Sequence, residues 1–349
     1  MTPTLPPDTI PAGDAPARVA CAECGTEQPV NKTGVIRKHR ASAEGAGRSL
    51  PCPGSGAPVG TARIPHRSKS GFYRCPITGE YLRSVTTILG KGSPKEALVH
   101  WAAKLSAESA MENLPALVKA SRRPDDRAEM VKWLSRAHTR KKDERADLGS
   151  AVHALIEAEV LGTPVPQELL DNPEMRPYIA HFREFVADWR IEFTASEMVV
   201  ANYADQYAGT LDYRFRSAPL ARLWQLDPGT EFMGDTKTGG ELDERTYDGH
   251  VRGVYPEAGV QLSAYRRAPY GWLRDGTRVE VPLAHDVGVV LHLRPEGYRL
   301  YPVRCGDDVF EVFKHIRHVA DFHSQLARTV VGDALTPPSS KNATRNEAA

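Results

Sequence analysis

The sequence contains no run of about 18 apolar residues, so we expect no transmembrane helix. Its first 20 residues also lack the apolar stretch of a secretory signal, and a cytoplasmic location is therefore expected. Cysteine is scarce, with 5 in 349 residues. In a cytoplasmic chain, so few cysteines favour metal ligands or free thiols over disulfide bonds.

Net charge is also nearly absent, because 45 Lys and Arg residues oppose 44 Asp and Glu residues, which gives +1. This balance hides a local difference. Residues 1–75 contain ten basic and five acidic side chains, a net charge of +5, which leaves −4 for residues 76–349. A basic front segment on a mildly acidic body favours contact between that segment and a polyanion.

The chain also lacks internal repeats and the G-x-x-x-x-G-K-[ST] motif of nucleotide-hydrolysing motors, which excludes a fused helicase or ATPase. It does contain 41% hydrophobic and 26% charged residues, which is typical of a chain with a globular core. We expect a disordered leader, a zinc-finger-like module, a linker whose residues 61–75 could instead begin a first hairpin, one large domain and a disordered tail. These segments span residues 1–17, 18–60, 61–83, 84–335 and 336–349.

Apolar periodicity divides the large domain into helices and strands. Helices are expected over about 94–112, 125–136, 144–161, 173–190, 257–268 and 307–331. Strands are expected over about 84–89, 197–203, 209–215, 222–226, 231–237, 287–293 and 298–303. This order predicts an α/β fold in which helices flank a mixed β-sheet.

Two acidic residues fall on neighbouring predicted strands. Asp212 ends the sequence Gly-Thr-Leu-Asp, and Asp235 lies in Gly-Asp-Thr-Lys-Thr-Gly. Because side chains alternate along a strand, Asp235 and Lys237 point to the same face. Gln261 and Tyr265 are four residues apart, so they share one face of the helix that follows.

His153 completes this group, one helical turn after Gly149. Two carboxylates and an imidazole are ligands that suit Mg²⁺ or Mn²⁺. A bound divalent cation lowers the pKa of its water and stabilises charge on a phosphoryl oxygen. A lysine beside the acids, here Lys237, offsets charge in the transition state. Together these residue types predict phosphodiester hydrolysis.

In this order, the motifs around His153, Asp212, Asp235 and Gln261 resemble those of the RecB-like branch of the PD-(D/E)XK nucleases. The chain is most similar to the phage exonucleases related to the CRISPR-associated RecB-like exonucleases, over roughly residues 84–330. The resemblance implies a restriction-endonuclease-like sheet and a metal-dependent DNA exonuclease that acts in phage recombination, repair or genome processing. DNA is the implied partner, together with a single-strand annealing or recombination protein.

The resemblance also implies a role for each residue of the motifs. It makes Lys237 the catalytic lysine. The implied ligands of Mg²⁺ or Mn²⁺ are His153, Asp212, Asp235 and the main-chain carbonyl of Thr236.

Three further residues lie beside the implied site. Gln261 and Tyr265 would contact the DNA end or hold the lysine, and Glu197 would have a supporting role. The iron–sulfur members of the family carry four cysteines around the nuclease core. Here only Cys305 follows Cys75, so no iron–sulfur cluster is expected.

A second candidate metal site lies in the front segment. Cys21 and Cys24 form a Cys-x-x-Cys knuckle, and His39 and Cys52 follow it at spacings that suit a structural Zn²⁺ ion. Zinc would fold a stretch that is too poor in apolar residues to bury a core alone. Free cysteines in a flexible arm are the alternative.

Basic side chains flank the histidine of this candidate zinc site. Arg37, Lys38 and Arg40 would place positive charge beside the metal, where they could hold DNA phosphate without reading sequence. His66 and Cys75 are alternative zinc ligands.

Two other functions remain open. The chain could be a non-catalytic DNA-binding adaptor for recombination that works through its zinc module. It could also be a structure-specific endonuclease, which would cut a covalently closed DNA circle, whereas an exonuclease would not.

Overall fold

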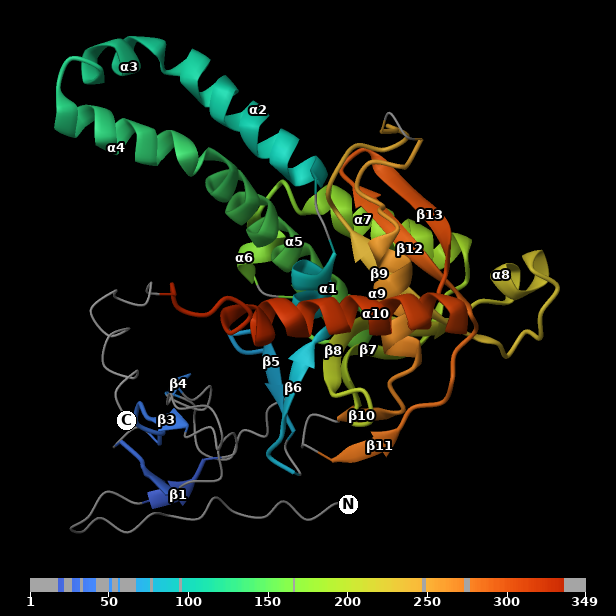
Figure 1. Ribbon diagram of the computed structural model, residues 1–349. Helices are drawn as coiled ribbons and strands as arrows, with labels where there is room; N and C mark the ends of the chain where they lie inside the picture. The colour runs from blue at the N-terminus through green and yellow to red at the C-terminus, as the bar shows by residue number, and fades with distance from the viewer. Residues whose placement is uncertain are drawn as a thin grey trace, which may run out of the picture. The chain divides into compact units, whose positions relative to one another are not determined.

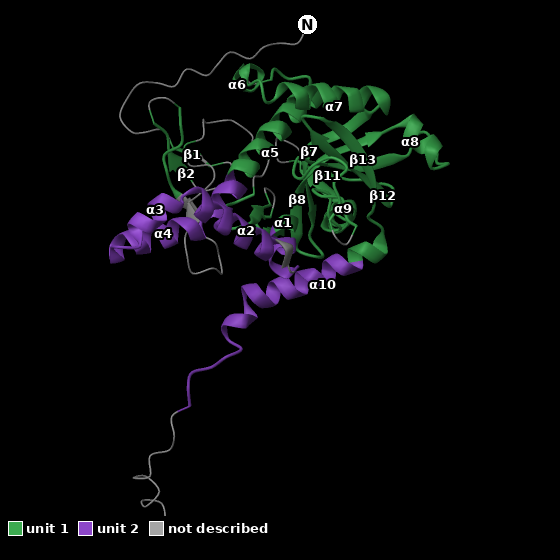
Figure 2. Ribbon diagram, turned by 90° about the horizontal axis from the view of Figure 1, so that it is seen from above, with its two compact units in different colours: residues 1–86, 144–310 green, residues 87–143, 311–349 purple. Residues whose placement is uncertain are grey.

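The computed structural model describes most of the chain, which divides into two compact units (Figure 2). The sheet unit comprises residues 1–86 and 144–310, and the helical unit comprises residues 87–143 and 311–349. Among the helices of the described residues, none combines the length and the apolar composition that a membrane crossing requires. The described residues are 18–21, 27–31, 34–41, 50–51, 56, 67–75, 78–93, 96–165, 167–246, 249–272 and 277–335.

A mixed sheet forms the centre of the sheet unit (Figure 1). The strand order is β11-β10-β7-β8-β9-β12-β13, with β6 paired to the start of β8 and β5 paired to β6. The pairs β6–β8 and β9–β12 are parallel and the other pairs are antiparallel, which confirms the predicted mixed α/β fold at this level. The strands are β5 (Phe72–Arg74), β6 (Tyr81–Ser84), β7 (Glu192–Asn202), β8 (Tyr207–Arg216), β9 (Glu231–Lys237), β10 (Tyr270–Trp272), β11 (Arg278–Glu280), β12 (Val287–Arg294) and β13 (Gly297–Arg304).

Helices pack on both faces of this sheet. Leu291 of β12 belongs to one buried cluster with Phe182 of α7. Gly288, whose position in β12 faces the other way, lies against Leu262 of α9. The sheet unit includes most of α5 (Ala137–Leu161), α6 (Gln167–Asp171), α7 (Arg176–Asp188), α8 (Ala218–Leu223), α9 (Glu257–Arg266) and the start of α10 (Asp307–Ser324).

Aromatic rings fill the core between α7 and the sheet. Phe182 and Phe185 are fully buried. The ring centroid of Phe182 lies 6.0 Å from that of Phe185 and 6.0 Å from that of Phe193, which in turn meets Tyr213 edge-on at 5.6 Å. Burial of each such ring contributes about 1.5–3 kcal/mol. This cluster therefore fixes the sheet that carries the candidate site.

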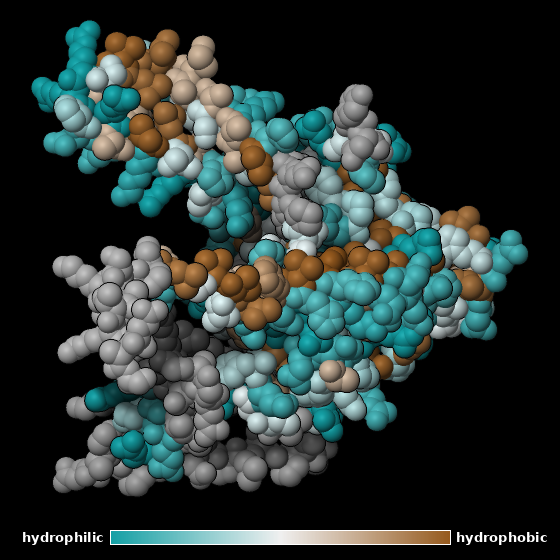
Figure 3. Space-filling model, in the orientation of Figure 1, coloured by the Kyte–Doolittle hydropathy of each residue, from teal (hydrophilic) through white to brown (hydrophobic). Residues whose placement is uncertain are grey.

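The helical unit has fewer buried side chains. All residues of α4 are described, and none of them is buried. Arg140 lies over the ring of Trp133, 4.3 Å from its centroid, and Figure 3 shows apolar side chains on the surface of the arm formed by α2, α3 and α4. The elements of the helical unit are most of α1 (Val85–Gly92), α2 (Glu96–Glu112), α3 (Leu114–Ala120), α4 (Pro124–Ser135), the start of α5, most of α10 and the 3₁₀ helix η1 (Leu326–Arg328).

The described part of the front segment contains two antiparallel strand pairs. Cys21 directly follows the first strand and is buried in a small cluster with Ile36 and Val19. Cys24 and Cys52, two of the four predicted zinc ligands, lie outside the described residues, as does His66. The pairs are β1 (Arg18–Ala20) with β2 (Glu27–Pro29), and β3 (Arg40–Ala41) with β4 (Leu50–Pro51).

The prediction of a strand over residues 222–226 is wrong, because α8 occupies Ala218–Leu223. Ser217 caps this helix, with its Oγ accepting a hydrogen bond from the backbone N–H of Leu220 at 3.2 Å. Pro219 lies in the first turn, where its missing N–H costs nothing. The cap and the proline therefore start a helix in a segment whose apolar pattern was ambiguous.

The prediction of a strand over residues 84–89 is also wrong after Ser84, because α1 begins at Val85. Val85, Ile88 and Leu89 are buried at the i, i+3 and i+4 spacing of a helix face. Tertiary burial of this face outweighs the preference of β-branched residues for strands.

Some boundaries also differ from the predictions. The segment 61–83, expected as a linker, contributes β5 and most of β6, so the sheet begins earlier than residue 84. The final helix, expected over 307–331, ends at Ser324 and is followed by η1. The predicted leader 1–17 and tail 336–349 lie outside the described residues.

Candidate functional site

The two predicted acidic residues lie on neighbouring strands of the sheet. β8 and β9 pair antiparallel, with Tyr213 opposite Gly234. One position further along, this register brings Asp212 of β8 beside Asp235 of β9. The backbone N–H of Thr236 donates a hydrogen bond to Asp212 Oδ2 at 2.7 Å, which fixes the orientation of that carboxylate.

Three side chains from three elements form the candidate metal cluster: His153 of α5, Glu197 of β7 and Asp212 of β8. The Nδ1 atom of His153 lies 3.4 Å from Glu197 Oε1 and 3.7 Å from Asp212 Oδ2. One ligand atom from each residue lies within 4.8 Å of the other two. Ligand atoms of an octahedral Mg²⁺ site are about 3 Å apart when adjacent and about 4 Å apart when opposite. The spacing and the donor types of this cluster therefore fit a small divalent cation.

Glu197 has a strained backbone. Its φ angle is 46°, in the left-handed region that side chains other than glycine rarely adopt. It lies between the paired positions Ser196–Tyr213 and Met198–Leu211, directly across from Asp212. Such strain persists only where the surrounding structure imposes it, and it is concentrated at functional sites. The structure thus gives Glu197 a more central place than the supporting role predicted for it.

Asp235 and Lys237 form a second part of the site. Asp235 is only 2% exposed, and its Oδ2 atom lies 2.5 Å from Lys237 Nζ. Its other oxygen, Oδ1, accepts a hydrogen bond from Gln261 Nε2 of α9 at 2.8 Å. Gln261 was predicted to contact the DNA end or hold the lysine, and in the structure its amide contacts the carboxylate that lies beside the lysine.

The phenol rings of Tyr265 and Tyr73 lie close to the acidic residues. A Cβ atom added at Gly209 would lie 2.4 Å from the ring of Tyr265, so the glycine of the Gly-Thr-Leu-Asp motif makes room for it. Burial, Tyr73 and the carboxylates of Asp212 and Asp235 raise the pKa of Tyr265 well above its usual value.

The sequence prediction missed Tyr73. It lies on β5, is 4% exposed, and makes a 2.9 Å hydrogen bond with Thr210 of β8. Burial raises its pKa, with Glu197 adding to the rise. Because Tyr73 lies in a segment that was expected to be a linker, nothing in the sequence indicated that it lies close to the candidate site.

The cluster holds more protons at neutral pH than the same residues would hold in water. Burial raises the pKa of Asp212 to about 7, and Asp235 adds to the rise. Burial alone would lower the pKa of His153, but Asp212 and Glu197 outweigh it and raise that pKa to about 9. Burial likewise opposes the charge of Lys237, but Asp235 and Asp212 raise its pKa. This concentration of negative charge is what a bound cation would neutralise.

The predicted ligand set and the observed cluster overlap in part. His153 and Asp212 lie together as predicted, with Glu197 as the third member of the cluster. Asp235 is engaged by Lys237 and Gln261 instead. The contact between Thr236 and Asp212 comes from the N–H of Thr236 rather than from its carbonyl.

The residues predicted for the zinc module are described in part. His39 is partly exposed, and its Nδ1 atom lies 2.9 Å from the carbonyl oxygen of Arg37. A carbonyl can only accept, so Nδ1 carries the hydrogen in this contact. The side chains of Arg37 and Lys38 are exposed.

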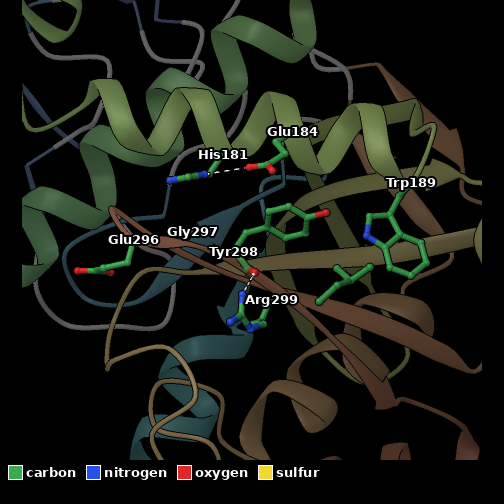
Figure 4. Close-up of a pocket in the computed structure, with 8 residues that line it drawn as sticks. His181, Glu184, Trp189, Glu296, Gly297, Tyr298 and Arg299 are labelled. Atoms are coloured by element: carbon green, nitrogen blue, oxygen red, sulfur yellow. Dashed lines mark hydrogen bonds and ion pairs between the residues drawn. The ribbon is translucent and has the colours of Figure 1, made fainter.

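A cavity of about 450 Å³ lies elsewhere in the sheet unit, between α7 and the β12–β13 turn (Figure 4). His181 pairs with Glu184 at 3.0 Å and with the carbonyl of Pro295 at 3.1 Å, and Tyr298 donates to Asp188. Its polar groups thus satisfy one another. None of the described site residues lines this cavity.

Comparisons with known proteins add no assignment. No protein-family model matches the chain, and no curated protein matches it. The functional conclusion therefore depends on the residues and their geometry.

Proposed function

We propose that this protein is a metal-dependent deoxyribonuclease that hydrolyses phosphodiester bonds and acts as an exonuclease. The observation that carries the proposal is the ligand cluster of His153, Glu197 and Asp212 beside the pair of buried Asp235 and Lys237. A merely structural cluster would leave several carboxylates buried against one another at a cost in stability. The need to bind a metal ion for catalysis would account for that cost.

The donor set decides which cofactor fits. Oxygen atoms of Glu197 and Asp212 with one imidazole nitrogen suit Mg²⁺ or Mn²⁺. When bound, such a cation would lower the pKa of its water and stabilise negative charge on the phosphoryl group. Asp235 would add negative charge at the edge of the cluster.

The remaining residues would act on the phosphate directly or hold those that do. Lys237 would place its ammonium beside the phosphoryl oxygens and offset the charge that develops there. Asp235 orients Lys237, and Gln261 orients Asp235 through the contacts described above. The side chain of Lys237 is 34% exposed, so its ammonium is accessible to a substrate.

We also propose that the front segment is a zinc module that holds DNA. What supports this is the position of the candidate ligands relative to the strands. Cys21 follows β1 directly, and His39 immediately precedes β3, whose Arg40 pairs with Pro51 of β4. In sequence, Pro51 immediately precedes Cys52. Exposed Arg37 and Lys38 would then bind phosphate beside the metal.

The test is digestion of end-labelled linear DNA beside a covalently closed circle, with Mg²⁺ or Mn²⁺ and with a chelator. The variant is Asp235→Asn, which keeps the size of the side chain but removes its charge. We expect metal-dependent loss of the linear DNA alone, reduced about 100-fold or more in the variant. Asp171→Asn, on the exposed helix α6, is the matched control and should cleave normally.

The other outcomes separate the alternatives. Cleavage of the circle would make the protein an endonuclease. No metal-dependent cleavage by folded protein, with DNA binding that is lost in Cys21→Ser, would instead favour the non-catalytic adaptor.

A further inference from the structure

Two side chains of β12 bind the backbone directly after Lys237. The parallel ladder between β9 and β12 ends at the pair Lys237–His292. Beyond that pair, Arg294 Nη1 donates to the carbonyl of Thr238 at 2.6 Å, and His292 Nε2 lies 2.7 Å from the carbonyl oxygen of Gly239. Side chains thus continue the contact between the two strands where the backbone ladder stops.

The contact at Gly239 is closely packed. His292 is fully buried, and Gly253 also lies against the carbonyl of Gly239. A Cβ atom added at Gly253 would lie 2.0 Å from the Gly239 oxygen and 3.0 Å from His292 Nε2, and its φ angle of 88° also favours glycine. The backbone after Lys237 is therefore in close contact with both the imidazole of His292 and the backbone of Gly253.

The protonation state of His292 follows from this geometry. A carbonyl oxygen can only accept, so Nε2 carries the hydrogen. Nδ1 is buried and has no hydrogen-bond partner among the described residues. Burial and the neighbouring Arg294 and Arg299 lower the pKa of His292, while the Gly239 contact and Asp243 oppose this. The ring is therefore a neutral donor whose contact with Gly239 is its one polar contact in the described structure.

We infer that His292 and Arg294 are positioning residues that hold Lys237 in place beside Asp235. Lys237 is the last residue of β9, and its four-carbon side chain keeps its position only if the backbone that carries it is fixed. This inference rests on the proposed function, in which Lys237 acts on the phosphate. It goes beyond that function because neither β12 residue lies in the ligand cluster or the Asp235–Lys237 pair.

The same loop offers a matched control. Asp243 and Arg299 form a two-point ion pair, with distances of 2.9 and 2.5 Å, between the loop after β9 and β13. Both side chains are largely exposed, and exposed ion pairs contribute little. Removal of this pair alters the loop but deletes neither of the hydrogen bonds from His292 and Arg294 to residues 238 and 239.

The first experiment compares the full-length variants His292→Phe, His292→Gln and Arg299→Gln by steady-state cleavage of linear DNA. Phe fills the space without a donor, whereas Gln can place an N–H near the same carbonyl. We expect kcat of His292→Phe to fall about 10- to 100-fold with KM within twofold, as for a residue 1 Å out of place. His292→Gln should recover most of the loss, and Arg299→Gln should match the wild type.

The second measurement does not depend on activity. Amide hydrogen exchange over residues 236–241 should be faster in His292→Phe than in wild type and unchanged in Arg299→Gln. Should His292→Phe fail to fold, Arg294→Lys provides the same comparison, because lysine keeps the positive charge but lacks the planar set of N–H donors of the guanidinium.

The outcomes distinguish the inference from the proposed function. If the wild type is inactive but exchange is faster in His292→Phe, the proposed function is overturned, whereas the role of His292 in fixing residues 238 and 239 is upheld. An active wild type whose kcat is unaffected by His292→Phe and Arg294→Lys would overturn the inference. Equal losses of kcat in His292→Phe and His292→Gln would also overturn it, since the donor would then be irrelevant.

Discussion

The two units place their apolar side chains differently. In the sheet unit, Phe182 and Phe185 are fully buried among rings and strands. In the helical unit, Leu98 is 51% exposed and Met111 is 73% exposed, and the fully described α4 has no buried residue. The buried rings of the first unit are supported by many neighbours, whereas these exposed side chains of the second unit have few. Rigid support is what a site with closely spaced charges requires.

The largest expected effect is on the core. Phe182→Ala should lower the free energy of unfolding by about 3–5 kcal/mol, because it removes a fully buried ring and leaves a cavity. Leu98→Ala, in the exposed part of α2, should change it by less than about 0.5 kcal/mol. Chemical denaturation of both variants measures the difference. Equal losses would show that the helical unit is supported as strongly as the sheet.

The next effect concerns pH and metal. The folded pKa values of Asp212 and His153, about 7 and about 9, both lie above their values in an unfolded chain. The cluster therefore gains protons on folding, and its contribution to stability is lost as pH rises through these values. Without metal, the thermal midpoint should fall between pH 6 and pH 9.

A bound cation competes with those protons, so the affinity for Mn²⁺ should rise by up to about tenfold per pH unit for each proton that it displaces. Titration of the protein with Mn²⁺ at pH 6, 7.5 and 9 measures this dependence. The variant His153→Gln should weaken it. An affinity that falls as pH rises would contradict the assignment of the cluster as a metal site.

The smallest effect compares two glycines, each with no described neighbour within 4 Å of an added Cβ. Gly90 lies inside α1, so Gly90→Ala should stabilise the protein by about 0.5–1 kcal/mol. Gly162 follows α5 with a φ angle of 63°, and Gly162→Ala should cost about 1 kcal/mol. Opposite shifts of the thermal midpoint are expected. Shifts of the same sign would show that backbone conformation does not decide the outcome.

Local patterns were sufficient for much of the sheet unit. The strand Glu231–Lys237 has the predicted bounds, because turn residues flank it on both sides, with Pro228 and Gly229 before it and Gly239 and Gly240 after it. The hairpin of β12 and β13 was predictable for the same reason. The helix Ala218–Leu223 was not predictable in this way. Its short apolar run fits either a helix or a strand, and the cap at Ser217 favours the helix.

The candidate site shows the same limit. Strand alternation placed Asp235 and Lys237 on one face, as the structure has them. It could not place Glu197 in the cluster, because alternation assumes an extended backbone and Glu197 has a left-handed one. Nor could it find His292, whose relation to Lys237 depends on a parallel pairing between strands 55 residues apart.

The left-handed backbone of Glu197 also limits how this chain can change over time. A glycine there would relieve the conformational strain and favour the folded state, yet it would remove a carboxylate from the cluster. Selection for higher stability therefore favours glycine at this position, whereas selection for the proposed metal site would favour glutamate. A lineage that retains glutamate at this position therefore keeps a fold that is less stable than the same fold with glycine there.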